Sequence, residues 1–280
     1  MSKRIKIRGS VLGVAALAYI VLFWGMGCAD SLILHPSRQS LPTNGAQRTM
    51  LDTPAGRLET FHLWTRSATQ QGQPRAYVLE TIPNAGRAEY AWAGAAYWAD
   101  WPVEYVSLNY PGYGGSEGNA TLAGVHRSAL AAYDALAARA EGKPIFVSGS
   151  SLGTAAALHI AANRKVAGVM LQNPVPLRQL ILGKFGWWNL WLVAWPVATQ
   201  IPRELDSLQN AERVHAPAVF VLAQQDQLVL PEFQQRVVDA YAGEKREVRF
   251  RGGHNDMPDG ADEQAVRAAQ AWLWQKQSGP

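Results

Sequence analysis

The sequence predicts an α/β fold in which a mostly parallel sheet of the eight-stranded type carries helices on both faces. Short apolar runs rich in Val, Ile, Leu and Phe alternate along the chain with longer segments of helical periodicity. Strands that are apolar on both faces are typical of parallel sheets covered on both sides. The 280 residues are enough for one such domain with a sizeable core.

The order of the expected elements follows from these patterns. An antiparallel hairpin comes first, because "TMLDT" and "RLETFHLW" flank the turn signal "PAG" at 54–56. Alternating strands and helices follow. We expect strands at 75–82, 103–110, 143–150, 166–174, 216–226 and 245–250, and helices at 89–101, 122–140, 152–164, 231–243 and 261–277.

The N-terminus has the pattern of a membrane-targeting segment. Four basic residues within the first eight precede "VLGVAALAYIVLFWGMGC" at 11–28, a run without charge. A positive region before an apolar run is typical of a signal anchor or a secretory signal, and the positive end stays in the cytoplasm. We therefore expect 1–28 to anchor the protein through a transmembrane helix, 29–48 to be a linker, and 49–277 to be an extracytoplasmic domain.

Cys28 offers a second mode of anchoring. It is followed by Ala29, which resembles the lipid-attachment box of bacterial lipoproteins, although Gly25 stands where that box prefers Leu. Lipidation of Cys28 is one alternative. The other is that Cys28 is a small apolar residue at the edge of the membrane.

Charge and cysteine content exclude several function classes. The formal net charge is +4, and the first eight residues carry all of that excess. The near-neutral remainder argues against a nucleic-acid partner, which would need a basic patch on the domain. A single cysteine excludes a disulfide framework and a cysteine-rich metal site. No spacing suggests a metal or nucleotide site, so we expect no cofactor.

A candidate catalytic set appears at three strand ends. Gly149-Ser150-Ser151-Leu152-Gly153 is a G-x-S-x-G motif between a strand and a helix, which predicts a nucleophile elbow with Ser151 as the nucleophile. Asp226 ends a strong apolar strand, and His254 lies in a Gly-rich loop after the last strand. A serine nucleophile needs a base and an orienting acid, and they follow in this order.

Each member of this set also has a simpler interpretation. Ser151 could only cap the following helix, and Asp226 could only be a turn residue. Asp206 is a rival acid, and Asp256 lies close enough to compete for His254. The three strand ends together favour the catalytic interpretation.

With these residues in view, the chain resembles the α/β-hydrolase superfamily over roughly residues 48–277, nearest to its membrane-anchored ABHD-like members with serine-aminopeptidase-like domains. The matching segments are "PNAG" at 83–86, "NYPGYGGSEG" at 109–118, "GSSLGT", "DQLVLP" and "GGHND". The resemblance implies an α/β-hydrolase fold, a serine-hydrolase mechanism and ester- or amide-type substrates.

The resemblance also implies an oxyanion hole made by the backbone N–H groups of Asn84 and Leu152. This sequence departs from the family at Ile82-Pro83, where His-Gly is usual. Pro83 reduces the freedom of that loop. Tyr113 is a candidate to add a hydroxyl to the site; the alternative is a packed loop tyrosine.

A Trp-rich segment at 180–202 follows the sixth strand. Trp187, Trp191 and Trp195 are spaced at i, i+4 and i+8, which predicts one helical stripe. The stripe either packs onto the domain or forms a short cap that lines an acyl pocket or touches the membrane interface. We expect these three tryptophans to contact substrate.

Two functions follow from these observations. The first is a membrane-anchored serine hydrolase that cleaves an ester or thioester, or an amide, of a small acyl substrate or a lipid. The second is a binding or scaffold protein that keeps the hydrolase fold but has an impaired oxyanion loop.

Overall fold

The computed structural model describes residues 13–14, 18–19, 27–54 and 56–277. Within that part of the chain, eight strands form one sheet in the order β1-β2-β4-β3-β5-β6-β7-β8. Only the β1–β2 and β2–β4 pairs are antiparallel, so the sheet is mostly parallel, as the sequence predicts. The strands are β1 (Gln47–Thr53), β2 (Gly56–Trp64), β3 (Ala76–Thr81), β4 (Val103–Leu108), β5 (Ile145–Ser150), β6 (Gly168–Gln172), β7 (Ala218–Ala223) and β8 (Lys245–Phe250).

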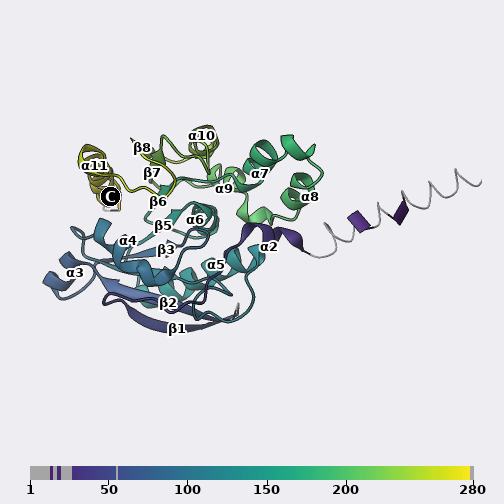
Figure 1. Cartoon of the computed structure of the whole chain (residues 1–280). Helices are drawn as coiled ribbons and strands as arrows, with labels where there is room; N and C mark the ends of the chain where they lie inside the picture. Colours follow the sequence, from purple (N-terminus) through teal and green to yellow (C-terminus); the bar gives the residue numbers. More distant parts are fainter. Residues whose placement is uncertain (1–12, 15–17, 20–26, 55, 278–280) are drawn as a thin grey trace, which may run out of the picture.

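Helices cover both faces of this sheet (Figure 1). On one face lie α4 and α11, and on the other lie α5, α6 and α10. The helices are α2 (Cys28–Ile33), α3 (Arg66–Gln71), α4 (Ala91–Tyr97), α5 (Leu122–Ala140), α6 (Leu152–Asn163), α7 (Leu177–Phe185), α8 (Ala194–Thr199), α9 (Ser207–Ala211), α10 (Pro231–Ala240) and α11 (Gly260–Lys276), with 3-10 turns at η2 (Ala88–Tyr90), η3 (Trp187–Asn189) and η4 (Arg203–Leu205).

The central strands are buried, and most of their side chains are apolar. Every residue of β4 and of β7 is buried, which is the pattern expected for strands between two helical layers. The parallel arrangement places the carboxyl ends of β5, β7 and β8 at one edge of the sheet, and site residues of open α/β sheets gather at that edge.

Part of the expected linker is ordered and attached to the domain. Residues 28–33 form α2, which lies against α8. Ala29 is buried, and its N–H donates to Gln200 Oε1 at 3.3 Å. The Asp30 carboxylate accepts a 2.7 Å hydrogen bond from the Leu122 N–H at the start of α5. The expected linker at 29–48 therefore begins with a helix that packs on the domain.

The Trp-rich segment does not form the single helical stripe that its spacing predicts. α7 ends at Phe185, and α8 begins only at Ala194. Between them Leu190 and Trp191 have φ values of 52° and 60°, a left-handed conformation that cannot continue a right-handed helix. The i, i+4 spacing of the tryptophans is therefore broken by a turn.

The predicted anchor at 1–28 lies for the most part outside the described residues. Among the residues that the structure does describe, no helix is both long enough and apolar enough to cross a bilayer.

Candidate active site

The turn between β5 and α6 holds Ser151 in an unusual backbone conformation. Its φ is 50° and its ψ is −121°, a region that residues with a side chain rarely adopt. The flanking glycines allow backbone contacts in this turn that are too close for any residue with a Cβ. A Cβ at Gly153 would lie 2.0 Å from the Thr81 carbonyl oxygen, and one at Gly149 would lie 2.6 Å from the Gly153 carbonyl oxygen. The Ser151 side chain makes no capping hydrogen bond to α6, so the helix-cap interpretation is wrong.

Ser151, His254 and Asp226 form one hydrogen-bonded chain. Ser151 Oγ lies 3.0 Å from His254 Nε2, and His254 Nδ1 lies 2.7 Å from Asp226 Oδ2. The three residues follow β5, β8 and β7. The Asp226 side chain is fully buried while that of His254 is 13% exposed. The structure thus brings the three predicted residues together, with the acid inside and the imidazole at the surface.

Each oxygen of the Asp226 carboxylate has two hydrogen-bond partners. Oδ1 accepts from the N–H groups of Leu228 and Val229, both at 2.8 Å. Oδ2 accepts from Gln234 Nε2 at 3.0 Å and faces His254. A buried carboxylate is tolerated when its oxygens are satisfied in this way. Gln234, on α10, was not foreseen from the sequence.

The two rival acids have other tasks. Asp206 is the N-cap of α9 and accepts from the N–H groups of Leu208 and Gln209. Asp256 accepts a 2.7 Å hydrogen bond from the Gly253 N–H and stays within the His254 loop. Both carboxylates therefore have hydrogen-bond donors of their own, and the hydrogen bonds described for them do not include His254.

Asn173 is a second residue that the sequence analysis missed. It follows β6, is fully buried and has a φ of 49°. Its Nδ2 donates to the His254 carbonyl at 2.9 Å, and its Oδ1 accepts from the Ala223 N–H at 3.0 Å. Asn173 therefore ties the His254 loop to β7. One sequence signal could have pointed to this residue: Asn173 stands at a strand end, in "LQNP", and Asn tolerates the left-handed backbone region that turns at such ends use.

The loop after β3 forms a tight turn in which the Gly86 N–H donates to the Pro83 carbonyl at 2.9 Å. Asn84 Oδ1 accepts from the His35 N–H at 3.0 Å and from the Tyr113 hydroxyl at 3.2 Å. Asn84 Nδ2 donates to the Ile33 carbonyl at 2.5 Å. The side chain of Asn84 is therefore held by Ile33, His35 and Tyr113, and Asn84 lines the same cavity as Ser151.

Tyr113 is buried beside that loop. Burial raises the pKa of its hydroxyl to about 12, so it remains a hydrogen-bond donor to Asn84. This position agrees with the packed-tyrosine alternative, and the expectation that Tyr113 contacts substrate is not supported by its contacts.

The second predicted oxyanion-hole residue is Leu152. Leu152 begins α6, so its N–H has no acceptor within the helix.

An apolar cavity of about 370 Å³ opens at Ser151. Asn84, Ser151 and Leu152 form its floor, and α7, α8 and α2 form its walls. The apolar side chains of the wall include Leu32, Leu180, Ile181, Phe185, Trp188 and Val197. This cavity can accept an acyl chain next to the Ser151 hydroxyl.

The cavity uses a different tryptophan from those predicted. Trp188 lines it, whereas Trp187, Trp191 and Trp195 do not. Those three side chains are 68%, 49% and 54% exposed. The cavity lining therefore does not support the expectation that these three tryptophans contact substrate. The packing alternative holds in part, because the Trp191 indole Nε1 donates to the Leu182 carbonyl of α7. The turn at Leu190 and Trp191 breaks the helix, so the three rings do not share one helical face.

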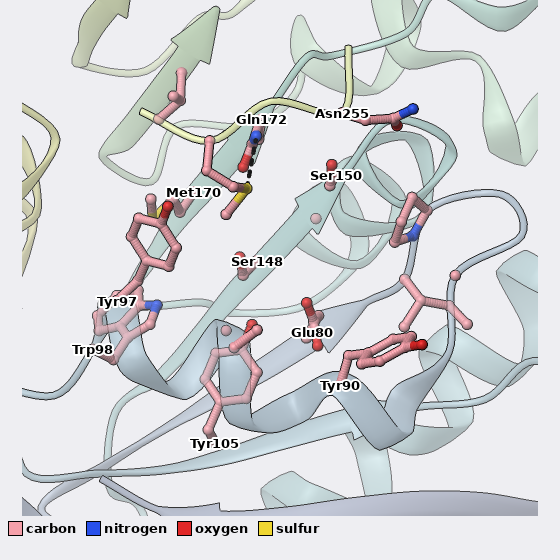
Figure 2. Close-up of a pocket in the computed structure, with 18 of the residues that line it drawn as sticks. Glu80, Tyr90, Tyr97, Trp98, Tyr105, Ser148, Ser150, Met170, Gln172 and Asn255 are labelled. Atoms are coloured by element: carbon pink, nitrogen blue, oxygen red, sulfur yellow. Dashed lines mark hydrogen bonds between the residues drawn. The ribbon is translucent and has the colours of Figure 1, made fainter. Parts of the chain in front are cut away.

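A second cavity, of about 270 Å³, lies on the other side of the elbow and is lined by Ser150 and His254. Figure 2 shows Glu80, Tyr105 and Ser148 directed into it from three neighbouring strands. Burial raises the pKa of the Glu80 carboxyl, and nearby hydroxyls offset this only in part. This cavity is more polar in character than the one at Ser151 and does not include the Ser151 hydroxyl.

Comparison with known protein sequences gives a partial match only. No family model matches the chain. An uncharacterized protein of Mycobacterium tuberculosis is 30% identical over 158 residues, which is 55% of this chain and 54% of that protein. The chain thus matches about half the length of this curated relative.

Solved structures resemble the chain over more of its length. Est1E from Butyrivibrio proteoclasticus, solved with ferulic acid bound, has a TM-score of 0.65 at 16% identity and covers 82% of this chain and 100% of its own. A Pyrococcus furiosus esterase has a TM-score of 0.64 at 13% identity over 88% of this chain and 98% of its own. An acetyl xylan esterase from a Paenibacillus species has a TM-score of 0.61 at 17% identity over 89% and 93%. At these identities the likeness concerns the fold, which is the α/β-hydrolase fold.

Proposed function

We propose that this chain is a serine hydrolase that cleaves carboxylic esters or thioesters through an acyl-enzyme on Ser151. The observation that carries the proposal is the hydrogen-bonded chain from Ser151 Oγ through His254 to the buried carboxylate of Asp226. This arrangement activates a serine hydroxyl, and its members are recognised by geometry rather than by position in the sequence.

In this mechanism the Ser151 oxygen attacks the acyl carbon while His254 Nε2 takes the hydroxyl proton. Asp226 keeps the proton of the imidazole on Nδ1 and stabilises the imidazolium that forms. The N–H groups of Leu152 and Asn84 stabilise the oxyanion of the tetrahedral intermediate. His254 then protonates the leaving group, and a water molecule, activated by the same imidazole, hydrolyses the acyl-enzyme.

Ester-type substrates are favoured over amides by two observations. The cavity beside Ser151 is walled mainly by apolar side chains, which suits an acyl chain and offers no charged group for a peptide amine. The named structural neighbours include an esterase and an acetyl xylan esterase. Amide cleavage is the less favoured activity of the same site.

The second candidate is a binding or scaffold protein with an impaired oxyanion loop. Pro83 in that loop is the observation that favours it, because proline removes backbone freedom next to Asn84. The two candidates differ in whether Ser151 reacts.

Labelling with a fluorophosphonate probe tests the choice, since the probe reacts only with an activated serine. We expect wild type and Ser150→Ala to be labelled and Ser151→Ala to remain unlabelled and unable to hydrolyse p-nitrophenyl esters, with its thermal midpoint nearly unchanged. Ser150 is the matched control because it is the adjacent residue of the same turn. A folded wild type that is neither labelled nor active would instead support the scaffold function.

We also propose that the enzyme is an ABHD-like membrane-anchored member of the superfamily whose domain lies outside the cytoplasm. The proposal depends on the basic N-terminus followed by the uncharged run at 11–28. Either that run or a lipid on Cys28 would hold the protein at the membrane, and the substrate would be a small acyl compound or a lipid.

A further inference from the structure

The large exposed apolar side chains of the molecule are concentrated in one short segment. Within the described residues, the seven between 185 and 195 range from 39% to 74% exposed. They are Phe185, Trp187, Trp188, Leu190, Trp191, Leu192 and Trp195. We call this set the Trp patch. Contiguous exposed apolar surface of this kind marks a contact surface rather than ordinary exposure.

A local turn determines the backbone course of this segment. Leu190 and Trp191 adopt left-handed backbone conformations, which are unfavourable for such residues. The Trp191 N–H donates to the Gly186 carbonyl at 2.8 Å, and its indole Nε1 donates to the Leu182 carbonyl at 3.0 Å. These bonds stabilise the turn that connects α7 to α8, and the two helices pack against each other. The tryptophans are thus exposed by a hydrogen-bonded turn.

The composition of the patch fits a membrane interface. It holds four tryptophans, and the segment from Phe185 to Pro202 contains no charged residue. Tryptophan is enriched where a protein meets the headgroup region, because its ring is apolar and its N–H can be solvated.

The N-terminal apolar run reaches the domain at the same place. The described structure resumes at Gly27 after an uncharged sequence that starts at residue 9. It enters α2, which lies beside α8 at one end of the molecule (Figure 1). The Tyr19 hydroxyl donates to the Leu192 carbonyl, within the Trp patch, at 2.5 Å. A bilayer that receives the N-terminal run would therefore meet the Trp patch.

The Ser151 cavity borders this same surface. Phe185 and Trp188 belong to both the patch and the cavity lining, and the exposed Leu32 of α2 also lines the cavity. The lining also includes buried apolar residues such as Leu180 and Ile181. An acyl chain could therefore pass from a bilayer to Ser151 without crossing bulk water.

We propose that the Trp patch docks into the lipid–water interface and that the enzyme draws amphiphilic acyl esters from the bilayer into the Ser151 cavity. This inference rests on the proposed hydrolase function for its catalytic half, whereas the docking half stands on the exposed surface alone.

The experiment compares two double variants of the full chain, each lacking two exposed tryptophans. Trp187→Ser/Trp195→Ser removes patch residues that do not line the cavity. Trp64→Ser/Trp92→Ser is the matched control, because these tryptophans are 44% and 39% exposed outside the patch. Each protein is reconstituted with phosphatidylcholine vesicles and assayed on p-nitrophenyl acetate in solution and on a long-chain fluorogenic ester embedded in the vesicles.

We expect the patch variant to keep its rate on the acetate within about twofold and to lose about tenfold or more on the embedded ester. The control should keep both rates. An equal loss on the two esters, or no loss on either, would overturn the proposal.

Docking has a readout that does not need catalysis. Vesicles with brominated acyl chains quench tryptophans that enter them, and Trp24 of the N-terminal run gives the same background in every variant. We expect a smaller quenched fraction in the patch variant than in the control. Equal quenching would show that the patch stays out of the lipid, even if the esterase is active. If the wild type instead forms a dimer that only the patch variant loses, without quenching, the patch belongs to a second copy and the proposal fails.

Discussion

At the scale of single residues, the proposed mechanism depends on the proton staying on His254 Nδ1. Asp226→Asn tests this, because an asparagine has the same size and can still accept from the N–H groups of Leu228 and Val229, while its Nδ2 would face the donor Gln234 Nε2. Its amide N–H would then face Nδ1 and force the imidazole into the wrong tautomer. We expect kcat to fall by about 10³–10⁴-fold with the fold intact. Asp206→Asn is the control, since Asn caps a helix as well as Asp does, and its kcat on p-nitrophenyl butyrate should be unchanged.

Asn173 gives a second test at this scale. Glycine at this position keeps the left-handed φ of 49° without strain, so Asn173→Gly removes only the two side-chain hydrogen bonds to His254 and Ala223. We expect unfolding in urea to show a loss of about 1–3 kcal/mol. We also expect a lower kcat at nearly unchanged KM, because the His254 loop loses its attachment to β7. A variant that loses stability with full kcat would show that Asn173 does not position His254.

Some residues of the candidate site could be predicted from the sequence, and others could not. Ser151, Asp226 and His254 could be predicted because strand ends and chain order locate them. Asn173 and Gln234 could not, because their roles depend on which strands and helices become neighbours. Asn173 reaches His254 across 81 positions of the chain, a separation that carries no local pattern.

At the scale of the elements, the strands were predicted well and the Trp-rich segment was not. A buried strand can be predicted from its own apolar residues, as in β7. A helical stripe also needs a surface that covers all of its members, whereas Trp187, Trp188 and Trp191 stay between 49% and 68% exposed. Spacing alone therefore predicted a helix where a left-handed turn occurs.

The contact between α5 and α6 predicts a dependence of stability on pH. His126 and His159 stack edge to face there with ring centroids 5.3 Å apart. Burial, with a smaller contribution from His126, lowers the pKa of His159 from 6.5 to about 4. The folded state thus binds fewer protons than the unfolded state between these values. Its stability is complete above pH 6.5 and is lost as the pH falls towards 4.

We expect wild type to lose about 2 kcal/mol of unfolding free energy from this group between pH 7 and pH 5. His159→Phe keeps an aromatic ring and removes the titration, so its loss over the same range should be smaller by that amount. His215→Gln is the control, because His215 is exposed and should leave the loss as in wild type. Urea unfolding at the two pH values measures all three, and identical losses in His159→Phe and wild type would contradict the assignment.

At the scale of the whole molecule, α2 joins the apolar N-terminal run to the catalytic domain. It contacts α8. The carbonyl of Ile33, its last residue, accepts a hydrogen bond from Asn84 Nδ2 in the loop after β3. The segment that follows the apolar N-terminal run thus also supports a loop of the proposed active site. A linker was expected here because the sequence is polar and contains proline, and such composition does not reveal that Asp30 caps a helix 92 positions away.

This role of α2 predicts where the domain begins. A chain that starts at Gly27 keeps the Asp30 hydrogen bond to the Leu122 N–H and the burial of Ala29, whereas a chain that starts at Ser31 loses both. A lost N-terminal hydrogen bond of this kind costs about 1–2 kcal/mol, and a domain of this size changes its Tm by about 2–4 °C for each kcal/mol. We expect the chain from Ser31 to melt about 2–8 °C lower by differential scanning fluorimetry. Asp30→Ala in the chain from Gly27 separates the two causes and should reproduce most of the decrease. Equal melting temperatures for the two chains would show that α2 is a tether that adds nothing to the stability of the domain.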